Sequence, residues 1–349
     1  MKGLSAPSAL VNSDYMGRVF QQLAIFGVFV LLLIVADILA PGFLAISHLG
    51  EVLGQASILG FVTLGEVLVL IVGDGGIDLS VGSVITVTSI VLSAEAQGQS
   101  GRMPWAIIVV LALGTVVGLV NGLGVVYARI PPLIMTLAVS SVIEGAYLMA
   151  TNGFAAGSTP ASFNNLWTGS LGGLFTGSTL IWLALALVLG LLLGYTRYGR
   201  LLCLVGGNRA AARASGITVS RVVVTTYVLT ALMATVGGLA LTGYIGVPSV
   251  TTGANYTLMA IAAAVIGGAT FEGGVGTVLG AVGGALVMTV LGAILTDLNM
   301  AEAGRQILEG VVIVGVVMMY QGRTGGVGKW LHRSTRASVQ VEVSDSANG

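Results

Sequence analysis

Long apolar runs with almost no charge dominate this chain, and they constrain its fold more than any other feature. Residues 20–40, for example, contain a single charged side chain, Asp37. A helix needs about 20 consecutive apolar residues to cross the roughly 30 Å hydrocarbon core of a bilayer. With 55% hydrophobic and 8% charged residues, and a mean hydropathy of +0.99, the chain cannot build a water-facing surface. We therefore expect an all-α, polytopic membrane protein.

About ten apolar segments are long enough, or nearly long enough, to be transmembrane helices. They are residues 20–40, 51–72, 78–94, 105–127, 133–150, 179–195, 222–244, 258–270, 276–295 and 307–320. The eighth is short. The predicted organisation is a cytoplasmic N-terminal segment at 1–19, a transmembrane domain at 20–320 and a cytoplasmic C-terminal tail at 321–349.

The basic residues predict the orientation of these segments, because cytoplasmic loops carry an excess of Lys and Arg. With ten spans and a cytoplasmic N-terminus, twelve basic residues fall inside and two, Arg102 and Arg305, fall outside. We therefore predict that both termini are cytoplasmic.

Several chemistries have no support in the composition. The only lysines are Lys2 and Lys329, and neither ends a glycine-rich phosphate-binding loop of the kind that holds ATP. One cysteine, Cys203, and two widely separated histidines do not suggest a metal site. A net charge of zero suggests no nucleic-acid partner. We predict no catalytic residue, no metal and no cofactor in this chain.

The stretch IVGDGGIDLSVGS, residues 71–83, places two aspartates between apolar runs. The apolar part of the third segment, 81–94, forms only about 21 Å of helix at 1.5 Å per residue, so the preceding polar residues must reach membrane depth. Irregular backbone is tolerated there only when protein buries it or it lines a wet cavity. We predict that Asp74, Asp78 and Ser80 line a substrate pathway or gate. The alternative is a plain turn in which Asp78 or Ser80 caps the next helix.

Four more acidic residues lie within predicted spans: Asp37, Glu66, Glu144 and Glu309. Such residues usually face a bundle interior or a cavity, because exposing them to hydrocarbon costs several kcal/mol. Glu66 and Glu144 sit in the middle of their spans, and we add them to the candidate pathway. A purely structural role, in which they bond to neighbouring helices, is the alternative.

Small residues recur at every fourth position in two spans. The rows are Gly114, Gly118 and Gly122, then Gly276, Gly280 and Gly284. Glycine rows of this kind let helix backbones approach closely. We assign them to the scaffold.

The longest inside loop, 196–222, holds five arginines. Asn208 can cap a short helix over 209–215, rich in alanine, and Gly216 can end it. Anionic lipid headgroups would suit the arginines, whereas a soluble protein with a groove would suit the small alanine face. We favour the protein. The predicted contact set is Gly207, Asn208, Arg209, Ala211, Ala212, Arg213, Ser215 and Gly216.

Two outside segments, 151–177 and 246–256, are long and rich in turn residues. Phe163 and Trp167 are the predicted anchors for a partner, because aromatic residues often dominate interface energy. The alternative places both rings at the level of the lipid headgroups.

Four motifs in order carry a resemblance to a known family. They are GGIDLSVGS at 75–83, GLVNGLGVVYARIPPLIMTLA at 118–138, GGNRAAARASGI at 206–217 and AIAAAVIGGATFEGGVGTVLGAVGGAL at 260–286. Together they resemble the permease subunit of bacterial ABC importers for monosaccharides of the ribose, xylose, arabinose and galactose type. The chain departs from the family pattern at Ala138, Glu144 and Thr257, and the last two departures change charge.

The resemblance implies a monosaccharide permease of ten helices in the bacterial cytoplasmic (inner) membrane. It further implies a second permease copy, with which this chain forms one pathway, and cytoplasmic ABC ATPase subunits that dock on 208–216 and carry ATP and Mg. A periplasmic or surface-tethered sugar-binding protein would deliver the sugar outside. The alternatives are an ABC permease for nucleosides or branched-chain amino acids, and an ion-coupled secondary transporter that uses Asp74, Asp78, Glu66 and Glu144 as a relay.

Overall fold

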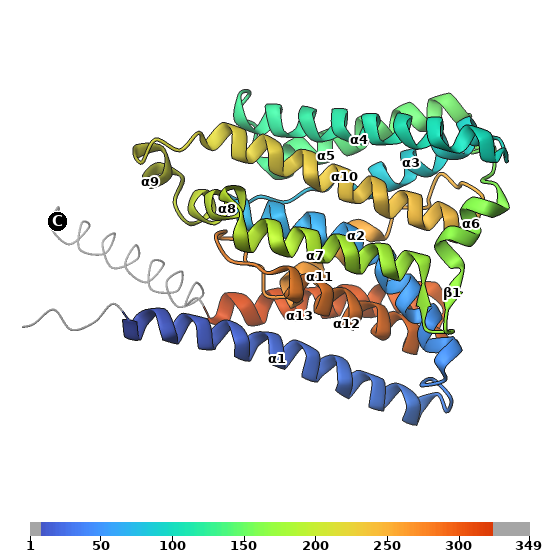
Figure 1. Ribbon diagram of the computed structural model, residues 1–349, viewed down its shortest axis with the longest axis horizontal. Helices are drawn as coiled ribbons and strands as arrows, with labels where there is room; N and C mark the ends of the chain where they lie inside the picture. Colours follow the sequence, from blue (N-terminus) through green and yellow to red (C-terminus); the bar gives the residue numbers. More distant parts are fainter. Residues whose placement is uncertain (1–7, 324–349) are drawn as a thin grey trace, which may run out of the picture. The chain divides into compact units, whose positions relative to one another are not determined.

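The computed structural model describes residues 8–323, and these are almost entirely helical (Figure 1). The long helices are α1 (Ser8–Leu39), α2 (Ile46–Val72), α4 (Met103–Val126), α5 (Pro132–Thr151), α7 (Gly177–Tyr195), α10 (Val219–Ile245), α12 (Val278–Asp297) and α13 (Glu302–Arg323). The shorter helices are α3 (Val81–Ala96), η1 (Ser100–Arg102), α6 (Ala161–Thr168), α8 (Arg197–Gly207), α9 (Arg209–Ala214) and α11 (Tyr256–Ile266). Two-residue strands, β1 (Ser170–Leu171) and β2 (Phe175–Thr176), pair antiparallel with Ser170 opposite Thr176.

The chain divides into two units, Met1–Asn299 and Met300–Gly349. In the described part of the second unit, α13 begins with an ion pair between Glu302 and Arg305. The first unit contains the remaining described helices, α1 to α12.

Helices α2, α10 and α12 form the core of the first unit. Helix α2 packs against α7, α10, α11 and α12, and α10 packs in addition against α3 and α4. Helices α1, α4, α5 and α7 expose many large apolar side chains, among them Leu31, Ile108, Val142 and Leu187. Such a surface is incompatible with water and suits contact with lipid.

Every one of the ten predicted spans falls on a helix of the described chain, so the all-α membrane class is confirmed. Within residues 8–323, seven helices are long and apolar enough to cross a bilayer. Helices α3 and α11 are apolar but shorter, with 16 and 11 residues. The number of crossings therefore stays a prediction.

Both glycine rows lie at close helix contacts, as expected. A Cβ atom on Gly118 of α4 would come within 2.5 Å of the Val228 Cα atom of α10. A Cβ atom on Gly284 of α12 would come within 1.9 Å of the Ala263 carbonyl oxygen of α11. Because backbone atoms cannot move aside easily, only glycine permits these contacts.

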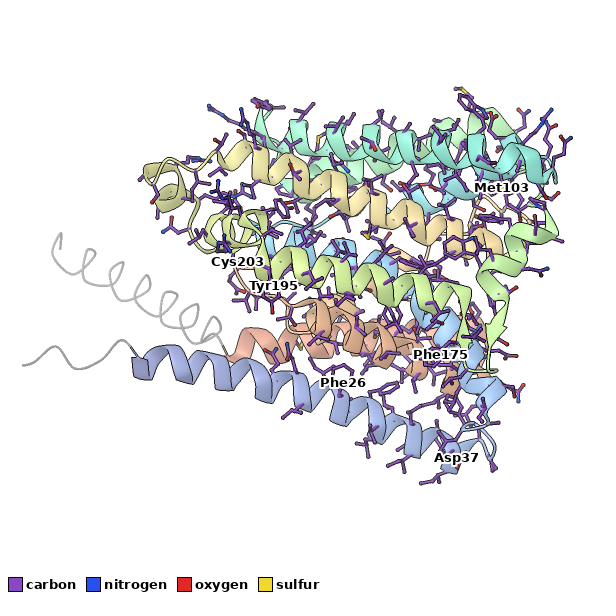
Figure 2. All side chains as sticks on the ribbon, viewed as in Figure 1. Phe26, Asp37, Met103, Phe175, Tyr195 and Cys203 are labelled. Carbon is purple, nitrogen blue, oxygen red and sulfur yellow. The ribbon has the colours of Figure 1, made fainter. Side chains whose placement is uncertain are left out.

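The loops gather at two opposite ends of the first unit, with α8 and α9 at one end and α6 with β1 at the other (Figure 1). Tyr195 and Cys203 lie toward the α8 end, whereas Met103 and Phe175 lie toward the other (Figure 2). Arg129 and the arginines of α9 line one hollow, so they share the α9 end.

The prediction that Phe163 and Trp167 are exposed anchors is wrong. Their side chains are 6% and 5% exposed. Trp167 packs so tightly on α10 that a Cβ atom on Gly243 would lie 2.2 Å from its ring, and it makes an edge contact with Phe61 of α2. These rings fasten α6 to the core and leave the surface of 151–177 to other residues, such as Phe154.

Candidate functional site

Residues 73–80, here called the 73–80 segment, connect α2 to α3 without helical structure, as the sequence predicts. The backbone takes positive φ angles at Gly73 (72°), Asp74 (60°) and Gly75 (69°). Glycine adopts this conformation easily, whereas an aspartate there is unusual. The turn sends the chain back into the helix bundle, where Asp78 and Ser80 are fully buried.

Asp78 organises the start of α3 with a single carboxylate oxygen. Its Oδ1 atom accepts hydrogen bonds from the backbone N–H of Ser80 at 2.8 Å and from the Ser80 hydroxyl at 2.6 Å. The capping alternative is thus partly wrong: Ser80 occupies the N-cap position, but its side chain makes no capping hydrogen bond. Asp78 instead bonds to the residue just before the helix.

Glu66 of α2 supports the same turn from one side. Its Oε1 atom accepts the backbone N–H of Asp78 at 3.1 Å, so the two predicted acidic residues meet in the structure. Glu66 is fully buried, like Asp78. Two carboxyl groups in such a place are costly unless hydrogen bonds or a partner compensate them.

Three further helices supply polar side chains to this cluster, and the sequence analysis did not single these residues out. Asn121 of α4 donates to the Ser80 hydroxyl at 2.9 Å, and Thr136 of α5 accepts the backbone N–H of Leu79 at 3.0 Å. Tyr227 of α10 is fully buried and lies within electrostatic range of Asp78 and Glu66. A signal for one of them was available, because Asn121 is the only asparagine in the ten predicted spans.

The buried polar cluster therefore comprises six residues: Glu66, Asp78, Ser80, Asn121, Thr136 and Tyr227. Within the described chain, Glu66 Oε2, Asp78 Oδ2, Asn121 Oδ1 and the Tyr227 hydroxyl have no hydrogen-bond partner. Three of these four atoms are acceptors. The cluster is suited to receive hydrogen bonds from hydroxyl groups or water.

A second junction lies where the starts of α3 and α11 meet. Thr257 of α11 accepts the backbone N–H of Gly82 at 3.1 Å, and Thr86 of α3 accepts the N–H of Gly253 at 3.0 Å. A Cβ atom on Gly253 would lie 2.1 Å from the Gly82 carbonyl oxygen. The beginnings of two short apolar helices thus meet inside the bundle.

Asp74 does not join the buried cluster, although only three residues separate it from Asp78. Its side chain is 66% exposed and its Oδ2 atom pairs with Arg209 Nη1 at 2.7 Å. Arg209 Nη2 also donates to the Gly73 carbonyl oxygen at 3.2 Å. Arg209 belongs to α9, so this contact ties the arginine-rich helix to the 73–80 segment.

Helix α9 forms as predicted, with bounds one residue shorter. Asn208 caps it by accepting the Ala211 N–H at 3.0 Å, and Gly216 follows with a φ of 77°. Ala211 is exposed, whereas Ala212 is only 4% exposed. Ala212 therefore packs inside this chain, and the prediction that it contacts a partner is wrong.

Arg209, the first residue of α9, is largely buried within this chain. Its side chain is 19% exposed. Burial lowers the pKa of the guanidinium and the Asp74 carboxylate opposes this shift. Arginine stays charged at neutral pH because its reference pKa exceeds 12.

Helix α8, which precedes α9, was not predicted from the sequence. This amphipathic helix buries Leu202 and Val205 and exposes Arg197 and Arg200. The Tyr198 hydroxyl bonds to Thr226 Oγ1 of α10 at 2.8 Å. Burial raises the pKa of Tyr198 to about 12, against the opposing effect of this hydrogen bond, so the phenol is neutral at physiological pH.

Glu144 stays apart from the other predicted pathway residues. It is exposed on α5, a helix whose fully buried side chains are Thr136 and Tyr147. In residues 8–323, no group of three or more His, Cys, Asp or Glu side chains is placed to hold a metal ion.

Comparison with known proteins places the chain among membrane permeases. Residues 48–317 match the family described as the permease component of the branched-chain amino acid transport system. The galactose/methyl galactoside import permease protein MglC of Haemophilus influenzae is 31% identical over 305 residues, covering 82% of this chain and 90% of its own length. The ribose import permease protein RbsC of Escherichia coli K12 is 32% identical and covers 86% of this chain and 93% of its own length. No solved structure gives a significant match.

A third relative is named for the import of a different compound. The autoinducer 2 import system permease protein LsrC of Klebsiella pneumoniae is 33% identical, with 86% of each chain covered. The fold and these similarities define a multi-pass membrane transport protein. The chain belongs to the permease component family that matches residues 48–317.

Proposed function

We propose that this chain is the membrane-spanning permease subunit of an ATP-driven ABC importer for a monosaccharide. The observation that carries the proposal is its similarity, over more than four fifths of the chain, to permeases named for galactose and ribose import. Placement in the bacterial cytoplasmic membrane, with both termini inside, follows from the same proposal and from the distribution of arginines.

ATPase subunits on the cytoplasmic side would dock on α9. The exposed side of this helix carries small residues, including Ala210, Ala211 and Ala214, and could enter a groove. In this proposal ATP and Mg bind to those subunits and the permease itself is not catalytic.

The contacts of Arg209 support a route from α9 into the helix bundle. Movement of α9 would be passed through the Arg209–Asp74 ion pair and the Gly73 carbonyl oxygen to the 73–80 segment. At its far end this segment bears Asp78 and Ser80, which bond to α2 and α4. A shift of α9 could therefore rearrange the buried polar cluster.

The exposure of Glu144 supports the presence of a second permease copy beside α5. A carboxylate in the middle of a span costs several kcal/mol if it faces hydrocarbon. In the single chain Glu144 is exposed. A second copy, with a shared aqueous pathway between the two, would give Glu144 a polar neighbour. A sugar-binding protein would then deliver the substrate at the end that carries α6.

A branched-chain amino acid importer is the second candidate, because the matching family bears that description. An ion-coupled transporter is less well supported, since Asp74 and Glu144 lie apart from Glu66 and Asp78 and do not form a relay with them.

The test is reconstitution of the permease in liposomes with its ATPase subunits and binding protein. Uptake of radiolabelled ribose, xylose, arabinose and galactose is measured beside leucine, a nucleoside and autoinducer 2. Accumulation of at least one sugar, with no competition from leucine, is the expected result. Accumulation of leucine, the nucleoside or autoinducer 2 alone would overturn the monosaccharide assignment and leave the family unchanged.

A further inference from the structure

A hollow of about 800 Å³ opens beside α9, and the proposed transport function uses only the Arg209–Asp74 ion pair of its lining. Its wall comes from four places in the sequence: Asp74 of the 73–80 segment, the end of α4 with the loop after it, helix α9, and the start of α10 with the residues just before it. Three arginines line it, namely Arg129, Arg209 and Arg213.

The charges in the hollow are unbalanced. Asp74 is the one acidic residue in the lining, and it is engaged with Arg209 at 2.7 Å. Arg129 and Arg213 are exposed, and their positive charges remain in excess. Arg209 adds a buried Nε atom that has no hydrogen-bond partner within the described chain. The hollow is therefore suited to an anion.

The start of α10 adds to this preference. Thr218, Val219 and Ser220 line the hollow, and Thr218 occupies the N-cap position without a capping hydrogen bond from its side chain. A helix of 27 residues has the positive end of its dipole at this point. Arginines and a helix N-terminus together form the usual surroundings of a bound phosphate.

The remaining wall is apolar and rigid. Tyr127, which is 69% exposed, and the half-buried Ile130 line it beside the buried Val125 and Val223. Pro131 and Pro132 follow Arg129, which itself holds a positive φ of 56°. Proline fixes the backbone, so this side of the hollow is formed in advance. The hollow thus combines an anion-binding rim with an apolar side.

Helix α9 separates the two surfaces that this end of the molecule presents. Arg209 and Arg213 are one turn apart and both line the hollow, whereas none of the α9 alanines does. The exposed side with Ala210, Ala211 and Ala214 is left for a different neighbour.

We propose that this hollow binds the phosphate of an anionic phospholipid headgroup, with Arg129 and Arg213 as its main partners. The apolar side beside Tyr127 and Ile130 receives the first carbons of the lipid chains. This apolar side favours a lipid over free phosphate, which offers nothing to bury there. An acidic segment of a partner protein would also pair with the arginines, and the experiment below distinguishes such a segment from a lipid.

The experiment uses the full-length permease, purified in neutral detergent. Phosphatidylglycerol and phosphatidylcholine with identical acyl chains are titrated, and bound lipid is counted by native mass spectrometry. The double variant Arg129→Gln/Arg213→Gln is compared with Arg197→Gln/Arg200→Gln. The second variant removes two exposed arginines of α8 that do not line the hollow. The melting temperature without added lipid confirms that both variants fold.

The hollow variant should lose affinity for phosphatidylglycerol by about thirtyfold, at roughly fivefold per arginine near an anionic lipid. The α8 variant should keep wild-type affinity, and phosphatidylcholine should bind both alike. Equal losses in the two variants would show unspecific surface attraction and overturn the proposal, as would no loss in either.

Two further arms test the other occupants. If inorganic phosphate at millimolar concentration displaces phosphatidylglycerol completely and raises the melting temperature as much, the ligand is free phosphate and the lipid assignment is wrong. If the hollow variant fails to co-purify with the ATPase subunit but binds phosphatidylglycerol normally, the hollow belongs to a protein partner. Retained co-purification with weakened lipid binding supports the proposal and leaves the docking of ATPase on α9 a separate question.

Discussion

The two carboxylate oxygens of Asp78 have different surroundings. A structural role of this residue can therefore be tested separately from a role in transport. Oδ1 holds the Ser80 N–H and hydroxyl, whereas Oδ2 has no hydrogen-bond partner in the described chain. Asp78→Asn preserves the first set of bonds and removes the charge. Asp78→Leu removes both and leaves two buried donors unsatisfied, at about 1–3 kcal/mol each.

We expect Asp78→Asn to keep the melting temperature of the permease and to lose most sugar uptake. Asp78→Leu should lose both. The measurements are thermal unfolding in detergent and uptake in liposomes, with Asp37→Asn as a control at an acidic residue outside the cluster. Normal uptake by Asp78→Asn would show that the residue only shapes the turn before α3.

Ala211 and Ala212 are adjacent but have different surroundings. Substitution by Glu should therefore impair folding at one position and docking at the other. Ala212→Glu places a carboxylate where the side chain is 4% exposed, which costs several kcal/mol and should unfold α9 or the permease itself. Ala211→Glu leaves the permease folded and adds a charge on the exposed side.

Ala211→Glu should therefore insert and melt normally but fail to co-purify with the ATPase subunit, because an unpaired charge buried in an interface is strongly unfavourable. Ala211→Ser is the matched control, since it adds a polar atom with little volume. A normal complex from Ala211→Glu would remove this side of α9 from the docking surface.

Helix α9 and the 73–80 segment are linked by one ion pair, and a double-mutant cycle can measure what the link does. Asp74 holds a φ of 60°, which asparagine tolerates, so Asp74→Asn removes the charge without new strain. Arg209→Gln removes the other partner. Asp74 is 66% exposed and solvent screens the pair, so its contribution to stability is about 1 kcal/mol and neither variant should unfold.

We expect each single variant to reduce the sugar transported per ATP hydrolysed by roughly fivefold or more, a usual size for coupling between two sites. The double variant should be no worse than either single one, because both remove the same contact. Arg200→Gln, on α8, is the control. Additive losses would mean that Asp74 and Arg209 act separately.

The sequence predicted the long elements well because bilayer thickness demands a length and an apolarity that are visible in any window of 20 residues. It missed α8 because a helix of 11 residues, with Leu202 and Val205 on one side and Arg197 and Arg200 on the other, has no long apolar run. It missed α6 for the same reason of length.

The candidate site was predictable only in part, since the sequence identifies polar residues but not their neighbours. Glu66 and Asp78 do meet. Asp74 was grouped with Asp78 because they are close in sequence, but three successive positive φ angles, at residues 73–75, turn the chain at Asp74. Tyr227 and Thr136 contribute from helices far along the chain, and no local pattern marks their approach.

In the first unit as a whole, the two ends that carry the loops have different surfaces, and we expect them to have different functions. The end with α8 and α9 carries arginines and a hollow, whereas the end with α6 carries Phe154 at 84% exposure and a short β-hairpin. Between them α2 and α10 are continuous helices of 27 residues each that contact both ends. Helices α2 and α10 are therefore rigid elements that can transmit a movement of α9 to the α6 end.

Energy for this motion should come from ATP on partner subunits rather than from an ion gradient. The chain offers no lysine in a phosphate-binding loop, and its acidic residues Asp74 and Glu144 lie apart from the buried pair Glu66 and Asp78. A relay for protons or sodium would need them in contact. Uptake in liposomes that contain permease, ATPase and binding protein should therefore continue when ionophores collapse the proton and sodium gradients. It should stop when ATP is replaced by a non-hydrolysable analogue. Uptake that ends with the gradients, or that runs without ATP, would contradict the ABC assignment and return the buried carboxyl pair to the role of an ion-binding site.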